Sequence, residues 1–228
     1  MDVLLIGGLW LDGSAWDAVL PALEELGHRP VPLTLPGQGD GRSAATLDEQ
    51  VAAVVAAVDA ADGAPLVVAH SAACTLGWQA VDARPERVAG LVLVDGFPEA
   101  DGELYAGAFP VVDGVVPFPG WEPFEGPSIS DLDAGLRDRI AAAAVTVPEQ
   151  VARGTVRLSD ERRHQVPVTM LCAEAPPEQV REWIAQGAAP EVSRMERIAL
   201  VPLDSGHWPM FSRPVELAEA VDRADRRS

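Results

Sequence analysis

Ser71 stands where an apolar run meets a run of small residues, a position typical of a reactive serine. The run Leu66–Ala69 is followed by His70, then Ser71, then Ala72 and Ala73. A serine on a sharp strand-to-helix turn presents its hydroxyl clear of the backbone, and the N-terminus of the next helix favours negative charge beside it. Such a turn needs small residues two before and two after the serine, and both are alanine here. Ser71 is therefore a candidate nucleophile; the alternative is a serine that only caps the helix.

His207 follows the last apolar run of the chain, in a loop that contains Gly206 and Trp208. A histidine at the carboxyl end of a strand lies on the side of an open α/β sheet where ligands bind, and from there it can reach Ser71 as a general base. Two other histidines, His28 after a predicted helix end and His164 in a charged run, are expected at the surface. No His, Cys or carboxylate pair has the spacing of metal ligands, so we expect no metal.

A glycine pair, Gly7 and Gly8, follows the first apolar run. Glycine lets backbone amides approach an oxyanion closely, so the amides of Leu9 and Ala72 are candidate donors of an oxyanion hole. The competing interpretation, a dinucleotide-binding loop, fails because no G-x-G-x-x-G pattern is present. We therefore expect no cofactor.

The elements that must position these residues are short apolar runs separated by amphipathic stretches. Runs of Val, Leu, Ile and Ala without polar alternation are typical of strands covered on both faces. The alternation predicts an α/β fold, a doubly wound and mostly parallel sheet of about six strands. The predicted strands are Val3–Ile6, Val31–Leu35, Leu66–Ala69, Gly90–Asp95, Val168–Ala173 and Ile198–Leu203.

Helical spacing of apolar residues predicts the helices between these strands. The clearest signal precedes the second of them, where Thr46 and Glu49 match the pattern of a capping box. Gly27 is a typical stop for the first. The predicted helices are Ser14–Leu26, Leu47–Ala61, Ala72–Ala83, Pro177–Ala185 and Pro214–Ala224.

The interval 96–165 is too long for an ordinary connection between strands. We expect it to form a short, mainly helical cap or lid, with helices at Asp131–Ala144 and Pro148–Leu158. Residues 1–95 and 166–228 then form the core of the same single domain. The alternative is a structural elaboration without function.

The composition excludes several classes of function. The net charge is −18, and all 17 cationic residues are Arg. This charge disfavours nucleic acid and anionic membranes, and the absence of Lys excludes Schiff-base and P-loop chemistry. Two cysteines are too few for a disulfide framework. With no leader and no membrane span in the sequence, we expect a cytoplasmic monomer or homodimer that binds a small-molecule substrate, with no nucleic acid or membrane as partner.

The order of glycine loop, serine turn and histidine loop resembles the α/β-hydrolase superfamily across essentially the whole chain. Two further segments support the resemblance. Leu35–Ser43 is similar to the family's D-L-P-G-H-G-x-S loop, and Pro85–Asp95 to its P-x-R-V-x-x-L-V-L-x-D strand. The chain most resembles the small esterases related to plant methyl esterases and hydroxynitrile lyases. Those lyases use an active-site lysine, which this chain lacks.

The resemblance implies a third catalytic residue, an acid, and here the chain departs from the family pattern. The family usually places an Asp in a G-x-x-D segment, but this chain has Cys172–Glu178, with Pro176 near the Asp position. Some members, haloalkane dehalogenases among them, use a carboxylate at the end of the preceding strand, which is where Asp95 stands. We expect Asp95 to orient His207; Glu174, or no acid at all, is the alternative.

Together these residues predict a serine hydrolase that cleaves a small apolar ester, lactone or thioester through an acyl-enzyme. The alternatives are a lyase or cyclase on the same scaffold and a ligand-binding protein with a degraded triad. Five aromatic residues either line an apolar pocket beneath the cap or pack the cap onto the core. They are Trp10, Phe118, Trp121, Phe124 and Trp208.

Overall fold

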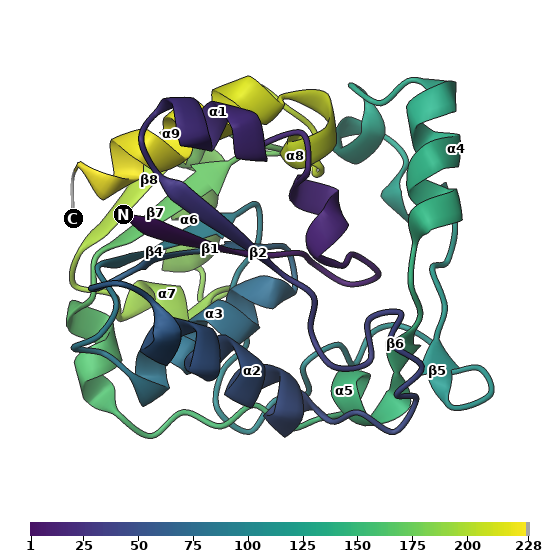
Figure 1. Cartoon of the computed structure of the whole chain (residues 1–228), viewed down its shortest axis with the longest axis horizontal. Helices are drawn as coiled ribbons and strands as arrows, with labels where there is room; N and C mark the ends of the chain where they lie inside the picture. Colours follow the sequence, from purple (N-terminus) through teal and green to yellow (C-terminus); the bar gives the residue numbers. More distant parts are fainter. Residues whose placement is uncertain (227–228) are drawn as a thin grey trace.

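A six-stranded sheet runs through the middle of the computed structural model, which describes residues 1–226 (Figure 1). The strands lie in the order β2-β1-β3-β4-β7-β8, and every neighbouring pair is parallel. This confirms the predicted α/β fold with a doubly wound sheet of about six strands. The strands are β1 (Asp2–Ile6), β2 (Arg29–Leu33), β3 (Leu66–His70), β4 (Gly90–Val94), β7 (Val168–Cys172) and β8 (Ile198–Pro202).

Burial explains why the strands appear in the sequence as unbroken apolar runs. The inner strands β1, β3, β4 and β7 are buried at every position, since helices cover both faces of the sheet. The edge strands β2 and β8 are mostly half-buried. Trp16 on one face and Trp78 on the other are the largest fully buried side chains.

Helices cover the two faces of the sheet in separate groups (Figure 1). One face carries α1 (Leu20–Glu25), α8 (Pro209–Ser212) and α9 (Pro214–Asp225). The other carries α2 (Leu47–Ala60), α3 (Ala73–Ala83), α6 (Pro177–Ala185) and α7 (Pro190–Ser193). No helix within residues 1–226 is both long enough and apolar enough to cross a membrane.

The predicted helix 14–26 is wrong in its first half, and the predicted capping box is confirmed. The chain forms a 3-10 helix η1 (Gly13–Trp16) and then starts again at α1, which has Pro21 in its first turn. A proline is tolerated there but would break a continuous helix, because it lacks an N–H and clashes with the preceding turn. At α2 the Thr46 hydroxyl accepts from the Glu49 amide, while the Glu49 carboxylate accepts from the Thr46 amide.

Most of the short elements in residues 96–165 lie beyond the carboxyl ends of the strands, whereas the last, Glu161–Gln165, packs against α3 just before β7 begins (Figure 1). Helical residues outnumber strand residues there, since β5 and β6 form only a two-residue antiparallel pair. The elements are β5 (Val115–Val116), η2 (Glu122–Phe124), η3 (Pro127–Ile129), α4 (Ala134–Ala143), β6 (Val147–Pro148), α5 (Glu149–Ala152) and η4 (Glu161–Gln165).

Of the two helices predicted in this segment, the first forms α4 and the second is shorter than expected. The helix predicted over 148–158 ends at Ala152 as α5. Beyond it the backbone pairs with another part of the segment: the Tyr105 amide donates to the Gly154 carbonyl, and the Val156 amide to the Glu103 carbonyl. These long-range hydrogen bonds replace those of a continued helix.

Two of the histidines were wrongly expected at the surface. The side chain of His28 is 5 % exposed and lies 3.2 Å from Asp222. His164 is buried against the Trp78 ring, in η4. In both places a helix packs over the imidazole, and a charged neighbourhood in the sequence did not indicate this.

Candidate active site

Ser71 lies in the sharp turn between β3 and α3. Its φ is +55°, a left-handed conformation that is strained for any residue except glycine. The Ser71 amide donates to the Val94 carbonyl, and its own carbonyl accepts from the Cys74 amide. The turn leaves no space around the serine, because a Cβ added at Gly96 would lie 2.5 Å from the Ser71 carbonyl oxygen. The serine does not cap α3, since no side chain caps that helix.

His207 reaches Ser71 from the loop after β8. Its Nε2 lies 2.9 Å from the Ser71 hydroxyl oxygen, which is hydrogen-bond distance. The segment 96–165 fixes this loop: the His207 amide donates to the Ser128 carbonyl, and the Gly206 amide donates to the Asp131 carboxylate. The sequence around Ser128 and Asp131 contains no pattern that indicates a contact with the histidine loop.

His70, the residue before the candidate nucleophile, also holds the histidine loop. Its Nε2 lies 2.7 Å from the carbonyl oxygen of His207, and because a carbonyl can only accept, this nitrogen donates. The side chain is buried, and burial together with the nearby His207 holds the pKa of His70 well below its usual range. A neutral His70 therefore ties the end of β3 to the backbone of His207.

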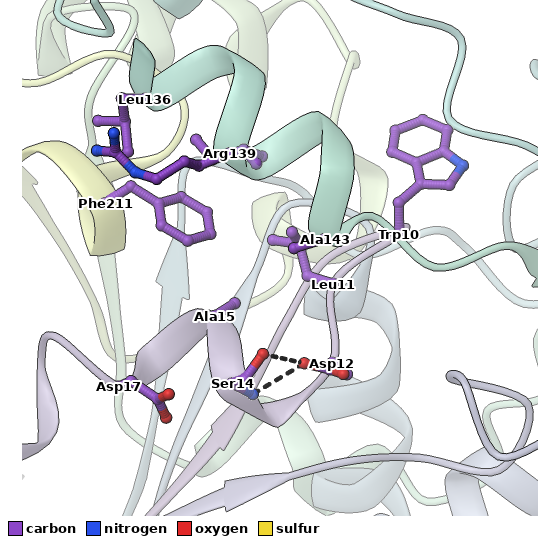
Figure 2. A pocket seen from close by; sticks show the side chains of 11 residues that line it. Trp10, Leu11, Asp12, Ser14, Ala15, Asp17, Leu136, Arg139, Ala143 and Phe211 are labelled. Atoms are coloured by element: carbon purple, nitrogen blue, oxygen red, sulfur yellow. Dashed lines mark hydrogen bonds between the residues drawn. The ribbon is translucent and has the colours of Figure 1, made fainter.

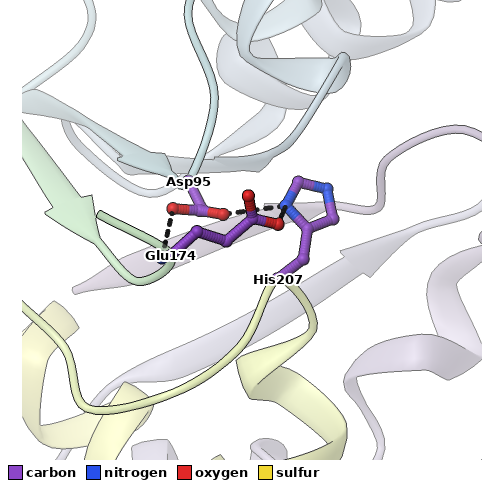
Figure 3. Close-up of side chains that lie close together, drawn as sticks. All are labelled: Asp95, Glu174 and His207. Carbon is purple, nitrogen blue, oxygen red and sulfur yellow. Dashed lines mark hydrogen bonds and ion pairs between the residues drawn. The ribbon is translucent and has the colours of Figure 1, made fainter. Parts of the chain in front are cut away.

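Two carboxylates meet the other nitrogen of His207 (Figure 3). Asp95, the residue after β4, places Oδ2 at 2.8 Å from Nδ1. Its Oδ1 accepts from the amides of Ala173 and Glu174 at 3.0 and 3.1 Å. Glu174 places Oε1 at 3.1 Å from the same Nδ1. Both carboxylates that the sequence offered as the acid thus contact the imidazole, and Asp95 is the one anchored by backbone amides.

These contacts determine the charge of His207. Burial alone would lower its pKa, but the hydrogen bonds that the imidazole donates to Asp95 and Glu174 outweigh burial and raise the pKa to about 9. The hydrogen bond to His207 in turn lowers the pKa of Glu174. The two carboxylates therefore favour the protonated form of the imidazole next to Ser71.

Asp95, Glu174 and His207 are also the one group of three within residues 1–226 whose ligand atoms all lie within 4.8 Å of one another, as a metal site requires. However, both carboxylates converge on the Nδ1–H of His207, and a cation would have to displace that proton. The geometry fits a hydrogen-bonded imidazole better than it fits a metal ion.

The glycine loop after β1 passes directly against the serine turn. A Cβ at Gly8 would lie 2.9 Å from His70 Nδ1 and 3.0 Å from Ser71 Cβ, so only glycine fits there. The amides of Leu9 and Ala72, on the two sides of this contact, donate to no other protein group within the part of the chain described.

A cavity of about 520 Å³ opens on Ser71 and Ala72. Its walls come from the start of the segment 96–165 and from the loop after α6. A smaller cavity of about 180 Å³ contacts Asp95, Glu174 and His207, and shares Gly96 and Phe97 with the first. The walls of the larger cavity are Gly96, Phe97, Pro98, Glu99, Ala100, Glu103, Gly187, Ala188 and Pro190.

The aromatic residues that the sequence singled out pack against each other. Trp208 contacts Trp121 and Phe124 edge-on, and the ring of His207 lies 4.7 Å from Trp208. None of the five lines the cavity that opens on Ser71. Trp10 borders a different hollow of about 410 Å³ between α4 and η1, which includes neither Ser71 nor His207 (Figure 2). In this structure the aromatic cluster packs residues 96–165 onto the core.

The chain is similar to proteins of known family and structure. A family model described as "Alpha/beta hydrolase family" matches residues 3–220. No curated protein sequence matches the chain. Among solved structures, an extracellular alpha/beta-hydrolase from a Paenibacillus species is similar with a TM-score of 0.80 and 18 % identity over 98 % of both chains.

Two further solved structures have the same fold. A methylesterase from Arabidopsis has a TM-score of 0.77 and 16 % identity over 98 % of each chain. A pyrethroid hydrolase from Sphingobium faniae JZ-2 has a TM-score of 0.73 and 24 % identity, over 99 % of this chain and 97 % of that one.

Proposed function

The chain belongs to the alpha/beta hydrolase family, and we propose that it is a serine hydrolase of small apolar carboxylic esters, lactones or thioesters. One observation carries this proposal: the hydrogen-bonded series from the Ser71 hydroxyl through His207 to Asp95. The esterase and hydrolase neighbours in structure support the reaction class at the level of the family. The missing lysine argues against the lyase mechanism of related proteins.

In the proposed mechanism the Ser71 hydroxyl attacks the carbonyl carbon of the substrate while His207 Nε2 removes its proton. The amides of Leu9 and Ala72 donate hydrogen bonds to the oxyanion that forms. The imidazolium of His207 then protonates the leaving alkoxide or thiolate, and an acyl-Ser71 ester remains. Water, activated by His207 in the same way, releases the acid and restores Ser71. Asp95 orients the ring and stabilises its protonated form.

We assign residues 96–165 the role of a cap within the single domain, since its contacts with Gly206 and His207 hold the general base in place. The substrate enters the 520 Å³ cavity, which is large enough for a small ester. We further propose a cytoplasmic monomer or homodimer without nucleic acid or membrane as partner, in keeping with the net charge of −18.

Hydrolysis of p-nitrophenyl esters of several acyl lengths tests the proposal, with Ser71→Ala as the inactive variant and Ser43→Ala, an exposed loop serine, as the matched control. We expect wild type and Ser43→Ala to turn over and to react with a fluorophosphonate probe. Ser71→Ala should lose at least about 10³-fold in kcat and all labelling. Absence of both turnover and labelling in wild type would favour a ligand-binding protein and overturn the hydrolase proposal.

A further inference from the structure

The cavity that opens on Ser71 carries charge of one sign only. Of the residues that line it, Glu99 and Glu103 are the charged ones, and the rest are apolar, glycine or Ser71 itself. Both glutamates lie on the stretch that leaves β4, on the wall next to the candidate nucleophile. A substrate that reaches Ser71 therefore passes two carboxylates and no cationic side chain.

Neither carboxylate is neutralised by a neighbour. Within residues 1–226 no Arg or His nitrogen lies within 4 Å of Glu99 or Glu103. The pKa of Glu99 is raised, first by partial desolvation of its carboxyl group and second by the negative charge of Glu103. Two like charges close together without a counterion repel each other. A cation in the cavity would offset this repulsion.

The wall that carries them is fixed in place. The Glu99 amide donates to the hydroxyl of Thr75, a buried residue of α3. The Glu103 amide donates to the Ala100 carbonyl, and the Glu103 carbonyl accepts from the Val156 amide. The backbone that carries these two exposed side chains is therefore held beside the cavity.

We propose that this cavity selects esters that carry a cationic group, a quaternary or protonated amine, over neutral esters and rejects those that carry a carboxylate. This substrate class rests on the proposed serine hydrolase function and adds a positive charge to the small, otherwise apolar ester. The apolar wall, with Phe97 and Pro98, contacts the hydrocarbon part, while Glu99 and Glu103 attract the positive end. In a water-like dielectric, two unit charges about 8 Å from the charge of the ligand should raise kcat/KM about fivefold from the anionic to the neutral ester, and about fivefold again from the neutral to the cationic ester.

Three p-nitrophenyl esters of matched shape test this: those of γ-trimethylammoniobutyrate, of its tert-butyl carbon isostere, and of glutarate as the mono-ester. Each kcat/KM is divided by the rate of the ester with hydroxide alone, which removes intrinsic reactivity. We expect the order cation, neutral, anion in wild type, with the differences shrinking in high salt. In Glu99→Gln/Glu103→Gln the three values should become nearly equal, and continued fluorophosphonate labelling of Ser71 would show that the fold and the serine are intact.

The matched control is Glu24→Gln/Glu216→Gln, which removes the same two charges from exposed positions on α1 and α9, on the opposite face of the sheet. It should keep the wild-type order. Equal kcat/KM for the three esters in wild type, or an order that survives in Glu99→Gln/Glu103→Gln, would overturn the inference while the hydrolase function stands. Failure of all three esters together with no fluorophosphonate labelling would overturn the proposed function and this inference with it.

Discussion

Glu174 Oε1 lies 3.1 Å from His207 Nδ1, the nitrogen that Asp95 also contacts at 2.8 Å (Figure 3). One N–H thus has two carboxylate acceptors. The side chain of Glu174 is 34 % exposed and that of Asp95 only 12 %. Because Asp95 is also held by two backbone amides, it needs no reorganisation to orient the ring. Glu174 is the more exposed and less constrained partner.

We therefore expect unequal and non-additive effects from the two carboxylates. Asp95→Asn should lower kcat/KM by about 10²-fold, less than the ~10⁴-fold typical of a triad acid, because Glu174 remains. Glu174→Gln alone should cost about threefold, and the double variant should reach the full ~10⁴-fold loss. Steady-state kinetics of wild type, the two single variants and the double variant gives the coupling free energy between Asp95 and Glu174. A larger loss in Glu174→Gln than in Asp95→Asn would make Glu174 the triad acid.

The raised pKa of His207 predicts an alkaline pH profile. A general base must be neutral, but two carboxylates raise the pKa of the imidazole to about 9, so that it stays mostly protonated below this pH. We expect kcat/KM to rise with pH and to level off only above about pH 9, and the midpoint to fall by about one unit in Glu174→Gln. Initial rates corrected for hydroxide hydrolysis measure this. A plateau already at neutral pH would contradict it.

Gly96 faces the backbone of the turn that holds Ser71, so a methyl group there should lower the activity proposed for this serine. In Gly96→Ala the new Cβ would lie 2.5 Å from the Ser71 carbonyl oxygen, and the serine turn has to move. We expect kcat to fall on the order of 10²-fold, since small displacements of a nucleophile have costs of that size. Gly135→Ala is the control, because its Cβ would meet nothing closer than 3.4 Å. Equal activity of the two variants would show that the turn tolerates the shift.

Chelation distinguishes a hydrogen-bonded imidazole from a metal site at the same three residues. Because Asp95 and Glu174 both accept from His207 Nδ1, we expect EDTA dialysis to leave kcat/KM unchanged and added Zn²⁺ to inhibit by displacing that proton. Loss of activity with EDTA and its recovery with a divalent ion would show that a metal takes part.

Much of the site was predictable because strand ends determine it. β3 and β4 are parallel neighbours, with His70 paired to Val94, so the residues that follow them, Ser71 and Asp95, must emerge side by side. The histidine loop follows the last strand, β8, and so begins at the same carboxyl end of the sheet. Residue type and strand order alone contain this information.

The rest depends on contacts between segments far apart in the sequence. The cavity walls at 187–190 come from a loop whose path no local pattern determines. The support that Ser128 and Asp131 give the histidine loop depends on how 96–165 folds back. The charged stretch Asp160–His164 appeared to be solvated, yet Arg163 is buried because its partners come from α3 and α7.

That buried arginine predicts a large effect on stability. Arg163 lies 3.2 Å from Asp82 and 3.1 Å from Glu191, and all three side chains are at most 7 % exposed. Arg163→Met leaves the buried Asp82 without a cation and Glu191 with only the exposed Arg194, at 3.7 Å, and should lower the free energy of unfolding by about 3–5 kcal/mol in urea denaturation. Arg162→Met, at an exposed neighbour, should change it little. Because neutral partners remove the uncompensated charge, Arg163→Met/Asp82→Asn/Glu191→Gln should recover part of the loss. A loss in Arg163→Met no larger than in Arg162→Met would mean that the buried charges are stabilised in another way.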